Sequence, residues 1–164
     1  MKTIPSICIG TALASLLVGC ASTPVAVAPV GPNPDGIQTT ASTGQLEVFS
    51  AMVGRTEGNN PTWYQHTDYY LFDQRGEELK HVDNAVGHYA TAPRLINLSP
   101  GQYMVKAQAK NYLWVKVPVV VEAGRTTRVH LDANWQTPDH SAKNEVVGIP
   151  GGYPIGWSPA FAGQ

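Results

Sequence analysis

Hydrophobic and polar residues alternate along much of the chain from Gln45 onward. Side chains of a β-strand point alternately to opposite faces, so apolar residues at every second position predict strands with one face in the core and one in water. The alternation is clearest between residues 103 and 131. It predicts three strands whose inward residues are Tyr103, Val105, Ala107 and Ala109, then Leu113, Val115, Val117, Val119 and Val121, then Thr127, Val129 and Leu131.

Four shorter runs precede these strands: residues 46–52 and 94–98 alternate, and residues 69–72 and 79–82 are the predicted strands of a hairpin. Between the second and third, Gly76 ends a turn at a position where a hairpin favours left-handed backbone. Before the long strands, Ser99-Pro100-Gly101 has the proline and glycine of a type II turn. About seven strands over residues 44–133 predict an all-β fold, a single antiparallel β-sandwich of the Ig-like or Greek-key kind.

Part of this region resembles a known family. The family motif begins with Leu98-Ser99-Pro100-Gly101-Gln102-Tyr103, continues through the strand Val117-Pro118-Val119-Val120-Val121 and ends with Glu122-Ala123-Gly124-Arg125-Thr126-Thr127. This order is similar to that of the prealbumin-like family, which includes the carboxypeptidase regulatory-like domains and the Cna-B-type modules of surface proteins. The resemblance implies a β-sandwich with a mostly non-catalytic role. Residues 58–66 depart from the pattern as a longer polar insertion.

Residues 134–164 predict a loop, a β-hairpin and a tail. The two strands, at 145–149 and 153–157, flank the turn Pro150-Gly151-Gly152. A lone two-stranded hairpin is marginally stable in water. We therefore expect it to pack onto the sandwich through Ile149, Ile155 and Trp157.

The first 19 residues have the pattern of a secretory signal, which predicts an N-terminal signal helix. Lys2 precedes an uncharged run at 4–18, which is shorter than the roughly 20 apolar residues of a transmembrane helix. The ending Leu17-Val18-Gly19-Cys20 resembles the lipobox of bacterial lipoproteins. This resemblance implies cleavage before Cys20 and a lipid on its sulfur, and Ala21 in place of an aspartate implies the outer membrane, facing the periplasm. The alternative is an ordinary signal peptide, or a signal anchor, that contains a cysteine.

Residues 20–43 are predicted to be the lipidated cysteine and a disordered tether. Four prolines and a single charge, Asp35, favour extended conformers over helix or sheet. The stretch 21–43 could reach at most roughly 75–80 Å.

Composition narrows the class of protein. Cleavage removes Lys2 from the 11 basic residues, so the mature chain has 10 basic against 12 acidic residues and a net charge of −2. This balance argues against a nucleic-acid partner, which needs clustered uncompensated cations. Cys8 leaves with the signal and Cys20 is lipidated, so the folded part has no disulfide, thiolate metal site or cysteine nucleophile.

Catalytic and metal-binding patterns are weak. The five histidines lack the i, i+2 or i, i+4 spacing of common zinc sites, so we expect no metal and no cofactor; His81, Asp83 and His88 are the weak alternative. No Gly-x-Ser-x-Gly motif surrounds Ser50, Ser99 or Ser158. We therefore expect no enzyme.

Aromatic residues provide the remaining signal for a binding site. The candidate contacts with a ligand or partner are Trp114, Lys116, Trp135 and Trp157, because aromatic rings are enriched at binding surfaces. Lys106 and Arg128 either join this surface or only solvate the outer faces. The structural alternative is that Trp114 and Trp135 are covered by the hairpin or the insertion.

The expected function is that of a lipid-anchored envelope protein, bound to the membrane through Cys20. It acts as a non-catalytic binding or structural module for a protein or polysaccharide partner. One alternative is a carbohydrate- or peptidoglycan-binding module that uses surface tryptophans. The other is a hydrolase whose site is not visible in the sequence.

Overall fold

The structure is a computed structural model that describes residues 27–87, 91–138 and 145–159. The predicted signal helix and Cys20 lie outside these residues. The described residues form eleven strands: β1 (Gly44–Phe49), β2 (Met52–Arg55), β3 (Trp63–His66), β4 (Tyr69–Phe72), β5 (Glu78–Val82), β6 (Leu95–Leu98), β7 (Gly101–Gln108), β8 (Trp114–Val121), β9 (Thr126–His130), β10 (Val146–Gly148) and β11 (Pro154–Trp157).

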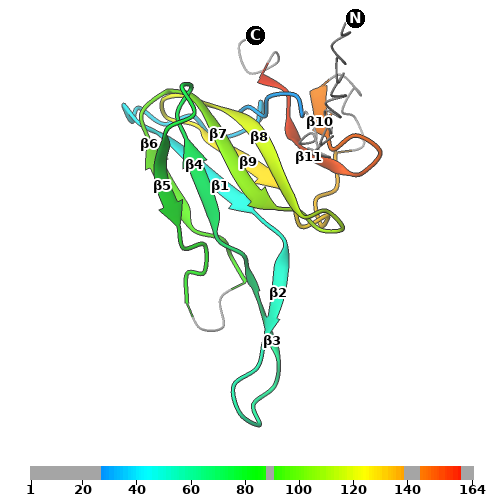
Figure 1. Cartoon of the computed structure of the whole chain (residues 1–164). Coiled ribbons are helices and arrows are strands. Elements are labelled where there is room, and N and C mark those ends of the chain that lie inside the picture. The colour runs from blue at the N-terminus through cyan, green and yellow to red at the C-terminus, as the bar shows by residue number, and fades with distance from the viewer. Residues whose placement is uncertain (1–26, 88–90, 139–144, 160–164) are drawn as a thin grey trace, which may run out of the picture.

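Two sheets form the body of the protein. A four-stranded sheet has the order β5-β4-β7-β8, and a three-stranded sheet has the order β6-β1-β9. Their inward side chains form one hydrophobic core between the two layers (Figure 1), which confirms the all-β sandwich. One pairing differs from the antiparallel prediction, because β1 and β9 run parallel. Parallel neighbours need a long connection, and the seven strands between β1 and β9 in the sequence supply it.

The predicted alternation places most core residues correctly. The valines at 115, 117, 119 and 121 are at most 1% exposed, and Thr127, Val129 and Leu131 are fully buried. Leu113, predicted to face inward, is instead 85% exposed. It lies before β8 in a turn where Asn111 has a φ of 66°, and this turn interrupts the strand alternation.

The two predicted turns have different outcomes. Gly76 has a φ of 85°, which confirms the left-handed position in the hairpin. Gly101 does not have a positive φ, so the predicted type II turn is wrong; Gly101 is instead the first residue of β7 and pairs with Val121. Tyr103 fixes the turn between β6 and β7, because its hydroxyl donates to the Ser99 carbonyl at 2.8 Å.

Residues 27–34, which we call the strap, lie within the stretch predicted as tether. Val30 is fully buried and bonds to the edge of β8: its N–H donates to the Pro118 carbonyl at 2.9 Å, and its carbonyl accepts from Val120 at 2.8 Å. The next residue, Gly31, donates to the Trp157 carbonyl at 2.7 Å. The folded domain therefore begins earlier than the predicted boundary at residue 44. Prolines fit such a segment because an edge position requires fewer N–H donors.

An arginine holds the other end of the strap. The guanidinium of Arg125 donates to the carbonyls of Asn33, at 2.8 Å, and Pro34, at 3.3 Å. Its other terminal nitrogen lies 2.9 Å from a carboxylate oxygen of Glu122. These bonds fix the strap to the turn between β8 and β9.

The C-terminal hairpin, β10 and β11, packs on the sandwich as expected. Ile149 and Ile155 belong to the core, and Trp157 is only 7% exposed. Gly151 has a φ of 70° in the Pro-Gly-Gly turn, and Gly152 donates to the Ile149 carbonyl at 2.8 Å. The hairpin is therefore part of the folded domain.

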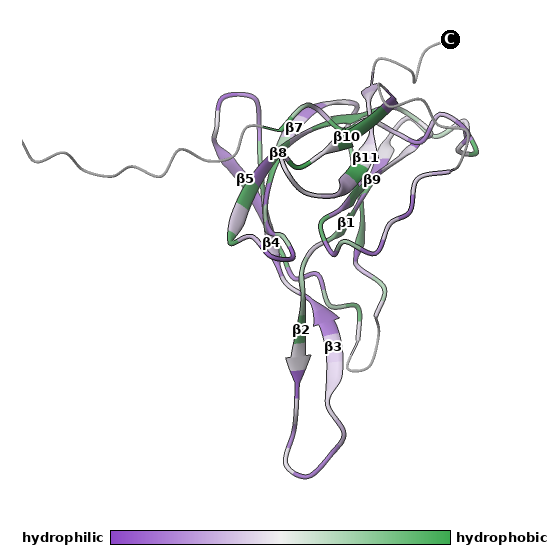
Figure 2. Cartoon of the chain, turned by 90° about the vertical axis from the view of Figure 1, so that its right-hand side faces the viewer, coloured by the Kyte–Doolittle hydropathy of each residue, from purple (hydrophilic) through white to green (hydrophobic). Residues whose placement is uncertain are grey.

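Residues 52–66, which we call the arm, project from the sandwich as a two-stranded ribbon of β2 and β3. The second part of the predicted polar insertion at 58–66 forms a strand, because Trp63–His66 pairs with Met52–Arg55. The arm extends from the end of the molecule opposite the strap and the hairpin (Figure 1), and its β3 strand is largely hydrophilic (Figure 2).

Replacing Gly156 should test the contact between strap and hairpin. A methyl group there would lie 2.5 Å from a methyl carbon of Val30 and 2.9 Å from the Arg128 carbonyl, so Gly156→Ala should cost about 1–3 kcal/mol by overpacking. At Gly148, in the same hairpin, the nearest atom is 3.4 Å away. Gly148→Ala should cost less than about 1 kcal/mol. Denaturant melts measure both costs, and equal costs would contradict the close packing of strap against β11.

Candidate functional site

The outer face of the four-stranded sheet carries Trp114 and Lys116, two of the four predicted contact residues. The strand register pairs Tyr70 of β4 with both His81 of β5 and Lys106 of β7, and Lys106 with Lys116 of β8. Trp114 lies two residues before Lys116 and therefore on the same face. We call Tyr70, His81, Lys106, Trp114 and Lys116 the aromatic–lysine cluster.

Within this cluster a lysine lies between two rings. The Lys106 ammonium is 5.8 Å from the centre of the Tyr70 ring and 5.4 Å from that of Trp114, distances at which cation–π attraction acts. The two rings are 5.9 Å apart and tilted by 51°, so they do not form one flat platform. Trp114 is 43% exposed, and neither the hairpin nor the arm covers it.

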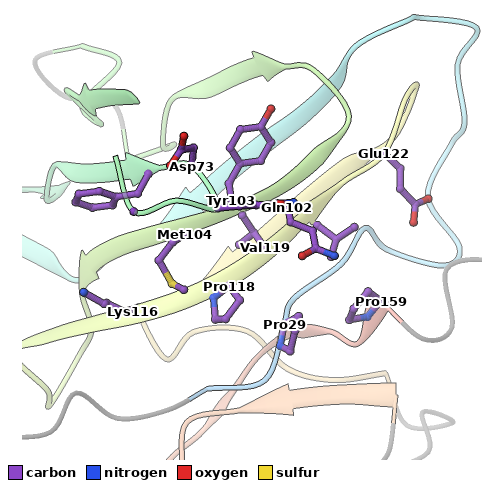
Figure 3. A pocket seen from close by; sticks show the side chains of 14 residues that line it. Pro29, Asp73, Gln102, Tyr103, Met104, Lys116, Pro118, Val119, Glu122 and Pro159 are labelled. Carbon is purple, nitrogen blue, oxygen red and sulfur yellow. The ribbon is translucent and has the colours of Figure 1, made fainter. Parts of the chain in front are cut away.

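A groove adjoins the cluster on the same sheet face. It has a volume of about 960 Å³, and its floor is the half-buried apolar side chains Phe72, Met104, Pro118 and Val120. Pro29 of the strap and Pro159 of the C-terminal segment form one wall (Figure 3). Lys116 lines one end, and Asp73 and Glu122 line other parts of the rim.

The charges on this face are unequally compensated. Asp73 accepts the backbone N–H groups of Arg75 and Glu77, at 2.8 and 2.9 Å. Glu122 is paired with Arg125. Neither Lys106 nor Lys116 makes an ion pair with any residue that the structure describes. Two lysines against the one carboxylate of Asp73 give the cluster and groove a net positive charge.

Trp135 and Trp157 lie elsewhere, so the four predicted residues do not form one site. They belong to an aromatic stack that includes Phe49 and His130, on the outer face of the three-stranded sheet. His130 lies between two rings, 4.5 Å from Phe49 and 5.1 Å from Trp135, and Trp135 meets Trp157 edge-on at 5.7 Å. The structural alternative, cover by the hairpin, therefore applies to Trp135 and not to Trp114.

Arg128 also lies on that second face and not in the cluster. Its Nε donates to a carboxylate oxygen of Glu47 at 2.9 Å, across the parallel pair of β1 and β9. This pair neutralises the centre of the three-stranded sheet. The two outer faces thus differ in charge as well as in their aromatic content.

The stack changes the acid–base behaviour of His130. The pKa of its imidazole falls from 6.5 to about 4, chiefly because of burial; Asp132 opposes this shift, and Arg128 and His66 add to it. The neutral ring is therefore the form that fits between Phe49 and Trp135.

Ser50, one of the three serines considered above as nucleophiles, has a structural role. It is fully buried, and its hydroxyl donates to the Thr67 carbonyl at 2.5 Å. His66 contacts the backbone carbonyl of Ser50, at 2.6 Å, and not its hydroxyl. Asn84, which sequence reasoning missed, completes this network by donating to the Val48 carbonyl and to the Ser50 hydroxyl oxygen. A buried hydroxyl held in this way is unavailable to a substrate.

The histidine-based metal hypothesis falls partly outside the described residues, because His88 does. The closest carboxylate to His81 is that of Asp68, at 3.6 Å, and not that of Asp83. Among residues 27–87, 91–138 and 145–159, no three His, Cys, Asp or Glu side chains are grouped closely enough to hold a metal ion.

Comparisons with protein-family models, with curated proteins and with solved structures give no match to this chain. Over its described part, the chain has no helix with the length and hydropathy of a membrane span.

Acid should weaken the fold through His130. Because the folded pKa lies below the unfolded value, the unfolded state takes up a proton first, so this stability is complete above about pH 6.5 and declines towards about pH 4. His130→Phe keeps an aromatic ring in the stack but cannot titrate. Its unfolding free energy should therefore fall less steeply over that pH range in denaturant melts, and equal slopes for the two proteins would contradict this role.

Proposed function

We propose that the chain is a lipid-anchored cell-envelope protein whose β-sandwich is a non-catalytic binding or structural module for a protein or polysaccharide partner. Residues 1–19 would be removed on export, and Cys20 would carry the lipid, in the outer membrane facing the periplasm. The lipobox resemblance at residues 17–20 supports the anchor.

The arm is the observation that carries the binding role. Only His66, where the arm joins the sandwich, is buried, and residues 56–62 at its tip are all exposed. A ribbon of two strands is marginally stable alone, and ordering it costs conformational entropy that little burial offsets. Such projecting segments on a rigid scaffold are typical sites of contact with other molecules. In Figure 1 the arm points away from the strap and the hairpin.

A carbohydrate- or peptidoglycan-binding module is the second candidate, and Trp114 favours it. Its side chain is 43% exposed beside Tyr70 and Lys106, and aromatic rings with a polar neighbourhood are enriched at binding surfaces. Retention of the protein on purified peptidoglycan separates the two candidates, because Trp114→Ala would abolish sugar binding and leave binding through the arm intact.

The anchor is tested by Cys20→Ser. Two acyl chains give stable membrane attachment, so the protein with Cys20 in place should incorporate a fatty-acid probe and fractionate with membranes. The variant should do neither. A variant that still labels and still fractionates with membranes would refute lipidation at Cys20.

The binding role of the arm is tested by photo-crosslinking in cells. Tyr64, on the arm, is 57% exposed, and Leu79, on edge strand β5, is 52% exposed, so the two positions offer matched access. A crosslinker at residue 64 should give a discrete adduct, and one at residue 79 should not. Adducts at neither position, or at residue 79 alone, would remove the arm as the contact.

A further inference from the structure

We infer that the outer face of the four-stranded sheet lies against the membrane that holds the anchor, with the aromatic–lysine cluster in an anionic headgroup layer. This inference rests on the proposed lipidation of Cys20. The protein would then contact the membrane through this surface as well as through the acyl chains.

The length of chain before the strap limits the distance to the membrane. Val27 is already part of the core, so only residues 21–26 separate it from Cys20. Seven Cα–Cα steps reach at most roughly 25 Å. That is about the size of a small domain, so one side of the sandwich must stay close to the lipid surface.

The direction of the strap selects which side that is. Val30 pairs with Val119 in parallel, so the chain runs back from Val30 towards Val27 as β8 runs back from Val119 towards Lys116. Pro29 lines the groove directly. The segment that leads to Cys20 therefore joins the domain at the rim of the four-stranded sheet, beside the cluster and the groove.

The chemistry of this face fits a lipid interface. Tryptophan and tyrosine concentrate at the headgroup level of membranes, and lysines bind anionic lipids through their positive charge. Here Trp114 and Tyr70 flank Lys106, and the apolar floor of the groove adjoins them. The outer face of the three-stranded sheet lacks this combination, because Arg128 is neutralised by Glu47 and its aromatic rings pack on one another.

The test uses the full lipidated protein in vesicles of phosphatidylcholine and phosphatidylglycerol that contain a headgroup-region quencher. Cys20 is the sole cysteine after the signal, so one introduced cysteine allows labelling at one position. Gln102→Cys places a fluorophore in the groove, and Asn97→Cys places one on the opposite outer face. Both residues are exposed amides on strands and leave the cluster intact.

We expect quenching at residue 102 and little at residue 97. Quenching should weaken as salt screens the lysines. Lys116→Gln should lower the ratio of quenched to unquenched label about fivefold, the effect of one cation near an anionic surface. Lys80 pairs with Leu71, whose side chain faces the core, so Lys80 lies on the other face of the sheet from the cluster. Lys80→Gln removes the same charge there and should leave the ratio unchanged.

Two results would overturn the inference in different ways. If the protein floats with the vesicles but the label at residue 102 is quenched no more than that at residue 97, the anchor stands and this orientation is wrong. If the protein does not float with the vesicles, the proposed lipidation fails and the inference fails with it.

Discussion

The edges of β8 and β9 meet at one side of the sandwich, and both would present unpaired backbone groups to water without the strap. Unpaired strand edges recruit other chains, and buried backbone groups without partners are costly. Val30 bonds to β8, Gly31 to β11, and Pro32 pairs with Thr127 of β9. Within β8 and β9, the Thr127 hydroxyl adds a bond to the Val120 carbonyl at 2.6 Å. Three consecutive residues of the strap, Val30, Gly31 and Pro32, thus close the sandwich.

Several other features depend on this closure. The hairpin of β10 and β11 could not persist alone, and it packs where Gly156 allows its backbone to approach Val30. Arg125 holds the far end of the strap through two carbonyls, so the strap is fixed at both ends. In the proposed lipoprotein, any pull on Cys20 would act directly on the edge of β8. The anchor and the domain would then be one mechanical unit rather than two parts joined by a long flexible tether.

The sequence predicts the features that depend on local alternation. Val117, Val119 and Val129 are buried because a strand that alternates apolar and polar residues has one way to face the core. The sequence does not predict the strap, because residues 27–34 have the composition of a linker and only tertiary contacts reveal their pairing. The sequence predicts a polar insertion at residues 58–66 but not its pairing as a ribbon. Most residues of β2 and β3 contact solvent, which removes the alternation that marks a buried face.

The candidate site shows the same limit. Trp114 and Lys116 share a face because they are two residues apart in one strand, and this was predictable. Their neighbours Tyr70 and His81 come from strands whose register depends on the whole sheet, so the sequence could not place them. Trp135 resembles Trp114 only in residue type, and its ring packs on the outer face of the other sheet, against His130.

Hydrogen exchange at the strap tests most directly whether it is part of the folded domain. The amides of Val30 and Gly31 donate to carbonyls of β8 and β11, so they should exchange as slowly as the amides of β7, which lies between two strands. Exchange through global unfolding alone is the predicted result for all of them. Rapid exchange at Val30 and Gly31 while β7 stays protected would contradict the account, because the strap would then detach from an intact sandwich.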